Sequence, residues 1–457
     1  MLVNKNSFVY SLSIITASLL LALVIPEDLS YLSFALISII QVVLNIVFVS
    51  KSISASLISF SSIFLLFSWF FHCGQILKLA FDIPGNVPLD VTKYVNYDTI
   101  VKSFKFYFVS QGMIAGGMMI TKVGYHRINS ESCKSSSFNI KKSALTLIFI
   151  GIIPRLYIDM RVLLIGLSDG YKGVYSIVFP QMLSSIAFFF DAGCIAALLD
   201  RNNVHKKTLF WVILIYKCIT MMTGARQEKV AFLVIWIFIY FFVTQRTRLR
   251  SIAFLCIIVI FGLQLINAIG LVRASSSISM AEIFIAMFSD NFSNLFGSML
   301  GEFGSAFTTL AVTVNQVPIN CSFGFGASYL AGLCSIIPTF ATKLGLGEAT
   351  AYISKLSGVA SFGGSYLGEI YYNFWWFGIM LCPLVGVVIS RIQNDIYDVD
   401  CEGNTTKKGV LAAIIMISLI LFVRGYFSDM VQKLVWTWIV LYFVNDRPVT
   451  IGRRGLK

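Results

Sequence analysis

The sequence predicts an all-α protein that crosses a membrane many times, and two observations support this prediction. Of its 457 residues, 57% are hydrophobic and only 12% are charged, and the mean hydropathy is +0.82. Soluble domains carry roughly 25% charged residues. Apolar runs of about 20 residues, the length of a membrane-crossing helix, recur from one end of the chain to the other. We therefore expect a polytopic integral membrane protein with about 12 transmembrane helices and a large helical periplasmic loop.

The predicted spans are apolar runs separated by short polar or charged interruptions. The first follows Lys5, is too long for the apolar region of a signal peptide and leads directly into the second, so we expect an uncleaved helix. The seventh, eighth and twelfth are shorter than the roughly 20 residues that a hydrocarbon core about 30 Å thick requires. In chain order the predicted spans are 8–25, 29–49, 53–77, 104–121, 143–165, 174–199, 208–223, 230–244, 251–272, 365–390, 409–427 and 431–444.

These spans divide the chain into three parts. Residues 1–272 are expected to form an N-terminal transmembrane bundle, residues 273–364 the large periplasmic loop, and residues 365–457 the C-terminal helices with a basic cytoplasmic tail. Within the loop, Gly297, Gly301 and Gly304 fall on one side of an expected helix, where glycine allows close packing. We expect the loop to cap the bundle, either as the wall of a cleft or as a packed lid.

The distribution of basic residues predicts the orientation. Lys and Arg concentrate in alternate interruptions, notably 122–142 and 245–250, and such a bias marks the cytoplasmic side. Both termini are then cytoplasmic, and the turn 223–229 faces outward. The formal net charge of +13 is explained by this rule, so it does not indicate a nucleic-acid partner.

Several cations nevertheless lie at or near the predicted outer ends of apolar helices. A long cationic side chain at such a position either reaches toward lipid headgroups or joins other cations around an anion. Arginine suits an anion with several oxygens, because its planar guanidinium binds phosphate through two parallel hydrogen bonds. The residues concerned are Arg155, Lys217, Arg226, Lys229, Arg273 and Arg424.

Three sequence stretches, taken together and in order, resemble the Wzy-type O-antigen polymerases, a family of oligosaccharide repeat-unit polymerases. They are GARQ at 224–227, TVNQVPINCSFGFGASYLAGLCSIIPT at 313–339, and GGSYLGEIYYNFWWFGIMLCPLVG at 363–386. The resemblance covers residues 200–430 by pattern and the whole chain by topology. It does not include the arginine-then-glycine spacing of some members, which neither Arg226 nor Arg273 matches.

The resemblance implies a GT-C-like glycosyltransferase in the bacterial inner membrane. Such an enzyme moves a growing chain from undecaprenyl pyrophosphate onto a new lipid-linked repeat unit at the periplasmic face, in lipopolysaccharide O-antigen biosynthesis. Lipid, the lipid-linked oligosaccharide and a chain-length regulator protein are the implied partners. Because periplasmic arginines are the family's functional residues, the resemblance assigns that role to Arg226 and, by position, to Arg273 and Arg424.

The chemistry of such a transfer calls for two kinds of residue. Charge that develops on the leaving pyrophosphate needs cations, and the attacking hydroxyl needs a base that takes its proton. The candidates for the base are Glu369, Glu302 and His72, all predicted near the outer boundary, with Glu369 favoured because it lies at the end of an otherwise uncharged span. The alternative for Glu369 is a structural partner of an arginine.

Other functions leave weaker signals in the sequence. Without a Walker A motif, GxGxxG or a Cys/His metal spacing, we expect no cofactor and no metal. A lipid-linked oligosaccharide flippase or other transporter would often show a repeat between its two halves, which is not visible here. An O-antigen ligase typically has a histidine in its large outer loop, and residues 273–364 contain none.

The predicted orientation can be tested with reporter fusions along the chain. Fusions after residues 226, 320 and 429 should report the periplasm, and fusions after 130, 248 and 400 the cytoplasm, because the basic segments stay inside. A cytoplasmic signal from the fusion at 226 would place Arg226 on the wrong side of the membrane for the proposed chemistry.

Overall fold

The computed structural model of the protein describes residues 5–53, 55–85, 87, 89–121, 138–168, 173, 177, 179–221, 227–244, 292–346, 353, 363–400 and 404–445. Nearly all regular structure in these residues is helical, and the β structure among them is a single isolated bridge between Val399 and Thr405. The prediction of an all-α protein is confirmed for this part of the chain.

The helices of the first half follow the apolar runs of the sequence. Ser30 and Ser59 cap the second and third helices with their side chains, which satisfies backbone N–H groups that the first turn leaves without a partner. Helix α9 is followed directly by a π-helical turn, Ile239–Thr244. The bounds are α1 Lys5–Val24, α2 Tyr31–Ser52, α3 Phe60–Ala80, α4 Tyr97–Ile120, α5 Ile140–Ser168, α7 Gln181–Leu199, α8 Lys206–Met221 and α9 Gln227–Phe238, with a short 3-10 turn at Val91–Lys93.

The second half contains shorter helices and then three long ones. The described part of the predicted periplasmic loop is helical, as expected. The bounds are α12 Phe292–Phe303, α13 Ser305–Gln316, α14 Ala327–Cys334, α15 Phe340–Lys343, α17 Tyr366–Phe374, α18 Cys382–Asp395, α19 Lys407–Val423 and α20 Phe427–Asn445. Every predicted span overlaps a described helix except 251–272, which lies outside the described residues.

Five helical segments among the described residues are long and apolar enough to cross a membrane. They are Asn6–Val24, Tyr31–Ser52, Phe60–Ala80, Gln181–Leu199 and Tyr366–Asp395. Such segments occur in both halves of the chain, as in a multi-pass membrane protein.

The segment predicted as one helix over 365–390 is broken in the middle. Trp375 has a left-handed backbone with φ 52°, and a 3-10 helix, Trp375–Leu381, joins α17 to α18. The freed carbonyl oxygen of Tyr372 accepts a hydrogen bond from the backbone N–H of Gly324, 2.9 Å away. A single apolar run could not reveal this break, because the partner that stabilises it comes from another part of the chain.

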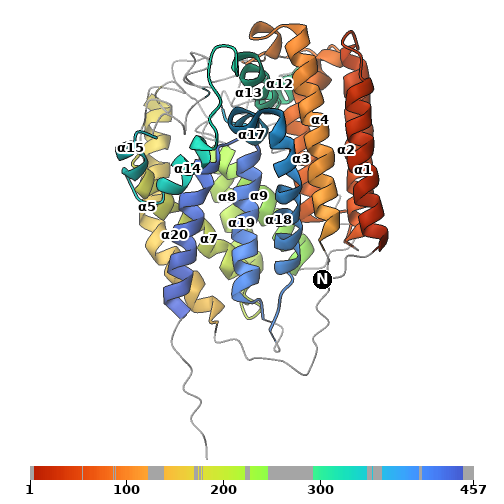
Figure 1. Ribbon diagram of the computed structural model, residues 1–457. Coiled ribbons are helices and arrows are strands. Elements are labelled where there is room, and N and C mark those ends of the chain that lie inside the picture. Colours follow the sequence, from red (N-terminus) through yellow and green to blue (C-terminus); the bar gives the residue numbers. More distant parts are fainter. Residues whose placement is uncertain are drawn as a thin grey trace, which may run out of the picture.

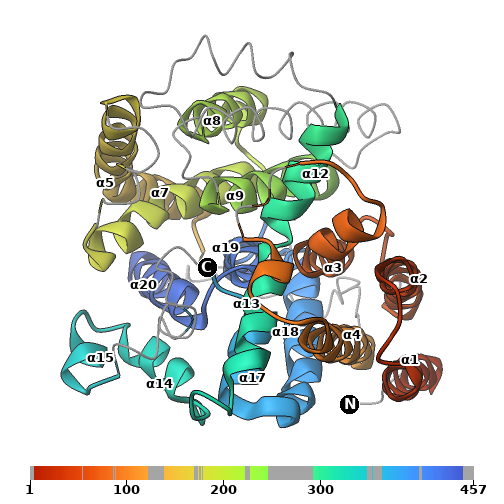
Figure 2. The ribbon, with the colours of Figure 1, turned by 90° about the horizontal axis from the view of Figure 1, so that it is seen from above.

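The helices form two groups joined by the C-terminal ones. Figure 2 shows α1 to α4 on one side of the molecule and α5, α7, α8 and α9 on the other. Helix α19 packs against α3, α7, α9, α18 and α20, and most of its side chains are buried. Close approach of α18 to α4 requires glycine, because a Cβ on Gly117 would lie 2.0 Å from the carbonyl oxygen of Pro383.

The described part of the loop lies at one end of the bundle. Figure 1 shows the first residues of α1 and the last residues of α20 at the opposite end from α12 to α15. The glycines predicted to allow close packing do so: a Cβ on Gly301 would lie 2.4 Å from Val87 Cγ2, and one on Gly304 would lie 2.4 Å from the backbone nitrogen of Gln75 in α3. We call this end of the bundle, where α12 to α15 lie, the loop end.

Candidate functional site

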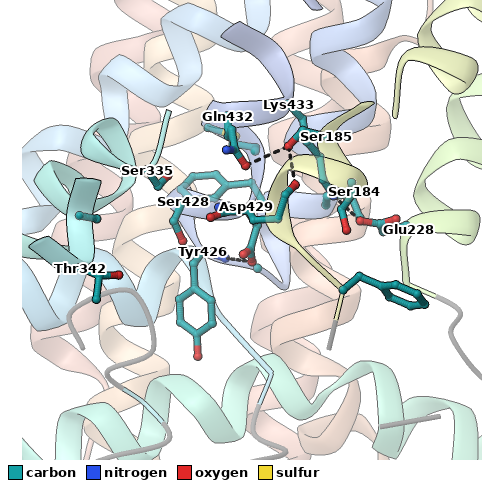
Figure 3. A pocket seen from close by; sticks show the side chains of 17 residues that line it. Ser184, Ser185, Glu228, Ser335, Thr342, Tyr426, Ser428, Asp429, Gln432 and Lys433 are labelled. Carbon is teal, nitrogen blue, oxygen red and sulfur yellow. Dashed lines mark hydrogen bonds and ion pairs between the residues drawn. The ribbon is translucent and has the colours of Figure 1, made fainter. Parts of the chain in front are cut away.

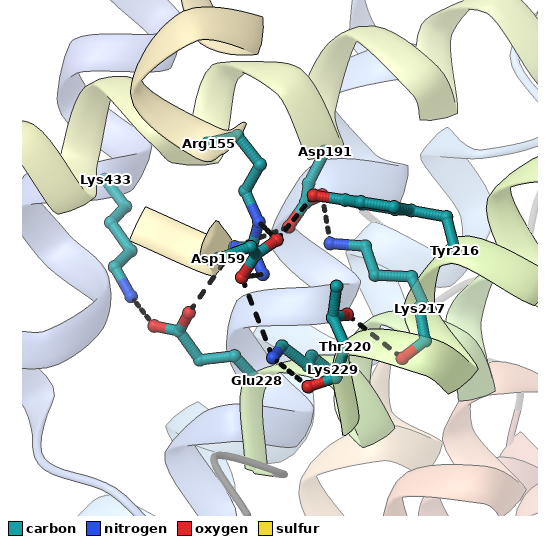
Figure 4. Close-up of polar contacts among 9 residues, drawn as sticks. All are labelled: Arg155, Asp159, Asp191, Tyr216, Lys217, Thr220, Glu228, Lys229 and Lys433. Atoms are coloured by element: carbon teal, nitrogen blue, oxygen red, sulfur yellow. Dashed lines mark hydrogen bonds and ion pairs between the residues drawn. The ribbon is translucent and has the colours of Figure 1, made fainter. Parts of the chain in front are cut away.

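A buried network of charged side chains lies among α5, α7, α8 and α9 (Figure 4). Its centre is Arg155, one turn before Asp159 on the same face of α5. The Arg155 guanidinium donates from Nε to Asp159 Oδ2 at 2.8 Å and from Nη2 to Asp159 Oδ1 at 3.1 Å. This pairing through two parallel hydrogen bonds fixes the arginine in the geometry in which guanidinium and carboxylate interact most strongly.

The other helices supply the remaining charges. Lys217 of α8 is fully buried and donates to Asp191 of α7, whose second oxygen lies 3.7 Å from Arg155 Nη1. Lys229 of α9 lies 3.6 Å from Asp159 Oδ1 and donates to the backbone carbonyl oxygen of Thr220 at 2.6 Å. Cations from three helices therefore share two buried carboxylates.

Burial explains why these charges are arranged in this way. An ion removed from water is strongly destabilised unless it is paired and hydrogen-bonded. The side chains of Arg155, Asp159, Asp191 and Lys217 are each at most 6% exposed. Each therefore depends on the others, and the helices that carry them are held in one register.

The sequence singled out Arg155, Lys217 and Lys229 as cations that either reach lipid headgroups or join other cations around an anion, and the structure places the three in one network with buried carboxylates. No pairing with Asp159 or Asp191 was predicted from the sequence. Asp159 could have been found, because it stands four residues after Arg155 in an apolar helix, the spacing of an intrahelical ion pair. Asp191 leaves no such local signal, because its partners are on α5 and α8.

Glu228 connects this network to a cavity. One of its carboxylate oxygens pairs with Lys433 of α20, and the other lies 3.9 Å from Arg155 Nη1. The Glu228 side chain is 52% exposed, whereas the Lys433 side chain is 13% exposed. Glu228 is thus the point at which the buried charges reach an open surface.

The cavity has a volume of about 590 Å³ and lies between α20, the start of α7 and the segment that follows α14 (Figure 3). The turn between α19 and α20 forms part of its wall. This size falls within the range of about 300–1,000 Å³ found for small-molecule sites. The lining residues are Phe179, Gln181, Ser184, Ser185, Glu228, Ser335, Ala341, Thr342, Leu421, Phe422, Gly425, Tyr426, Ser428, Asp429, Met430, Gln432 and Lys433.

Residues with hydroxyl, amide or charged groups lie in this lining beside apolar ones. One face of α20 presents four polar side chains to the cavity, because they form two pairs spaced four residues apart: Ser428 with Gln432, and Asp429 with Lys433. Ser185 Oγ donates to Gln432 Oε1 at 2.9 Å, which fixes the amide. The polar face could have been recognised in the sequence SDMVQK, where polar residues recur at helical spacing in the first turns of an apolar helix.

The three residues predicted as bases lie outside this lining. His72 is fully buried: its Nδ1 donates to the Ser68 carbonyl at 2.9 Å, and its Nε2 accepts from Ser365 Oγ at 3.0 Å. Those roles follow because a carbonyl oxygen can only accept. Glu302 is half-buried on α12.

Glu369 is 1% exposed, and both of its carboxylate oxygens are engaged. Ser328 Oγ donates to Oε1 at 2.6 Å, and the backbone N–H of Phe427 donates to Oε2 at 2.8 Å. Glu369 therefore binds the start of α20 to α14 from behind the cavity wall. The partners of Glu369 in these two hydrogen bonds are a serine and a backbone amide, whereas the alternative drawn from the sequence was an arginine.

The predicted arginines are only partly within the described residues. Arg424 is half-buried at the C-terminal end of α19, and a Cβ on Gly363 would lie 3.5 Å from its Nε. It directly precedes Gly425, which lines the cavity. Arg226 and Arg273 lie outside the described residues. Within the described ranges, no group of three or more His, Cys, Asp and Glu side chains could hold a metal ion.

The family model described as O-antigen polysaccharide polymerase Wzy matches residues 7–445, nearly the whole chain. No curated protein and no solved structure matches the chain.

The ion pair between Asp191 and Lys217 predicts a specific pattern of stability. Asp191→Leu should destabilise the protein by about 3–5 kcal/mol, because it leaves the buried Lys217 ammonium without its carboxylate. The double variant Asp191→Leu/Lys217→Met should regain most of that loss, since both charges are then absent. Thermal unfolding of the purified protein in detergent measures both effects.

The control for this prediction is Asp98→Leu, which removes an exposed carboxylate from the first turn of α4 and should change stability little. A double variant as unstable as Asp191→Leu alone would show that the pair does not act as a unit.

Proposed function

Because the chain belongs to the O-antigen polysaccharide polymerase Wzy family, we propose that it polymerises lipid-linked oligosaccharides in lipopolysaccharide O-antigen biosynthesis. The proposed donor is a growing chain on undecaprenyl pyrophosphate, and the proposed acceptor is a new lipid-linked repeat unit. The reaction would occur at the periplasmic face of the bacterial inner membrane, with both termini in the cytoplasm. The family match over residues 7–445 carries this proposal.

The cavity at the loop end of the bundle supports the proposal independently. A sugar is recognised by hydroxyl, amide and carboxylate groups, which make up much of the cavity wall. Its wall also includes Lys433 and Glu228, which join it to the buried cations. A polar site beside cations is what a substrate with a sugar at one end and a diphosphate at the other requires.

The cations would stabilise the leaving diphosphate. Bond breakage at the sugar C1 puts negative charge on the diphosphate oxygens, and fixed positive charge lowers the energy of that state. We assign this role to Arg226, Arg273 and Arg424 from the sequence; Arg155, Lys217 and Lys229, which are buried and paired with Asp159 and Asp191, would contribute through the charge of their network and not by direct contact. Lys433 joins them through its position on the cavity wall. A chain-length regulator protein is also a proposed partner, because the resemblance to the family implies one.

Deletion of the gene tests the proposed function. A strain that lacks a polymerase can still transfer single repeat units, so its lipopolysaccharide should carry one O-antigen repeat per molecule. Gel separation of the purified lipopolysaccharide measures this directly. Complete loss of O-antigen would instead indicate a flippase or a ligase, and accumulation of long lipid-linked polymer would identify the ligase.

Arg226→Ala should abolish long-chain O-antigen when it replaces the wild-type protein in that strain, with its level in the membrane unchanged. Arg226→Lys should restore only part of the polymer, because an ammonium cannot form the two parallel bonds of a guanidinium with phosphate. Arg273→Ala and Arg424→Ala should shorten the chains in the same assay. Normal chain length in Arg226→Ala would leave Arg226 as a residue that contacts lipid headgroups.

A further inference from the structure

Of the two carboxylates that line the cavity, Glu228 is paired with Lys433, and the other is Asp429. It lies in the first turn of α20, is exposed, and lines the cavity (Figure 3). Its Oδ2 accepts a hydrogen bond from the backbone N–H of Tyr426 at 3.1 Å, which fixes the orientation of the carboxylate. The candidates from the sequence, Glu369, Glu302 and His72, do not line the cavity.

We infer that the cavity binds the terminal sugar of the acceptor and that Asp429 is the catalytic base that takes the proton from its attacking hydroxyl. This inference rests on the proposed polymerase function and deepens it. In the reaction, the hydroxyl proton moves to the Asp429 carboxylate while the oxygen forms a bond to C1 of the donor sugar. The bond from C1 to the diphosphate oxygen breaks, and the diphosphate leaves with that electron pair.

The lining of the cavity fits a sugar better than a lipid chain. Ser184, Ser335, Thr342 and Gln432 offer hydrogen-bonding groups on several sides, which suits a ligand with hydroxyls around a ring. Tyr426 adds an aromatic ring to the wall. A volume of about 590 Å³ provides room for a short oligosaccharide, while a polyprenyl chain would leave these polar groups without partners.

The spacing along α20 places the proposed base one helical turn away from a cation of the cavity wall. Asp429 and Lys433 are four residues apart on one face, so they are separated by about 6 Å along the helix axis. Lys433 pairs with Glu228, which in turn lies 3.9 Å from Arg155. An acceptor hydroxyl held at Asp429 can therefore face C1 of the donor sugar while the donor's diphosphate lies toward Lys433 and the other cations.

Glu369 acts in this scheme as a positioning residue. Its carboxylate accepts from the backbone N–H of Phe427, two residues before Asp429, and from Ser328 of α14. It thereby holds the first turn of α20 at the cavity wall. In Glu369→Gln, the side-chain carbonyl oxygen can still accept one of these two hydrogen bonds, but the amide N–H faces the second donor. The substitution should therefore disturb the first turn of α20 without removing a step of the reaction.

The test uses the purified full-length protein and the lipid-linked single repeat unit extracted from the deletion strain. Asp429→Asn should lower kcat by about 10²–10⁴-fold with KM nearly unchanged, because asparagine can still accept from Tyr426 N–H but cannot take the proton. Asp429→Glu should restore part of the activity. The matched control is Asp98→Asn, which changes a carboxylate in the first turn of α4 and should retain wild-type turnover.

A second variant tests the position of the sugar without touching the base. Thr342→Trp fills the cavity and should raise KM about tenfold or more, whereas Leu344→Trp, on an exposed neighbour that does not line the cavity, should leave KM unchanged. Melting temperatures near the wild-type value establish that each variant is folded.

The outcomes separate this inference from the proposed function. Wild-type protein that forms no polymer from the lipid-linked unit would overturn the proposed function itself. Wild-type protein that polymerises, with Asp429→Asn within a few-fold of its rate, would overturn only the assignment of the base. An unchanged KM in a folded Thr342→Trp variant would show that the acceptor sugar does not bind in the cavity.

Discussion

The ion pairs of Arg155 are the interaction on which the rest of this structure depends. A guanidinium in the middle of an apolar helix is tolerated only if carboxylates are brought to it, and Asp159 and Asp191 serve that purpose. Asp191 then requires α7 to pack beside α5, and Lys217 requires α8 to join them. Apolar packing in a membrane is weakly specific, because lipid tails are as apolar as the side chains that they contact. The buried charges select one register among many that apolar packing alone would permit.

The same network sets where the cavity lies. Glu228 extends from it to Lys433 on α20, and this contact joins the helices of the charged group to the C-terminal helices. On the other side, α14 packs against α20 and Glu369 links Ser328 of α14 to the backbone of Phe427. The first turns of α20 are thus held from both sides, with Asp429 and Lys433 facing the space between. A fixed polar surface of this kind binds its ligand without a large cost in side-chain ordering.

The break between α17 and α18 contributes to this arrangement. With Trp375 in a left-handed conformation, the chain leaves α17 after Phe374, and the segment before α14 packs against the exposed helix end. Asn373 receives a hydrogen bond from the backbone N–H of Gly326 and donates to Ser328 Oγ. A continuous helix over this segment would lack the free carbonyl of Tyr372 that Gly324 uses. The backbone strain at one residue is offset by contacts that bring α14 to the cavity.

The sequence by itself determined the all-α fold class, the approximate positions of the described helices and the family resemblance that the family model confirmed. These properties follow from local features, because an apolar run of sufficient length has to be a helix in a membrane wherever its neighbours lie. Only the tertiary structure decided that Asp191 pairs with Lys217, that Glu369 is occupied by Ser328 and Phe427, and that Asp429 shares a cavity with Ser335 and Thr342. Each of these contacts joins residues far apart in the chain. Their partners are set by how the helices pack, and no short stretch of sequence contains that information.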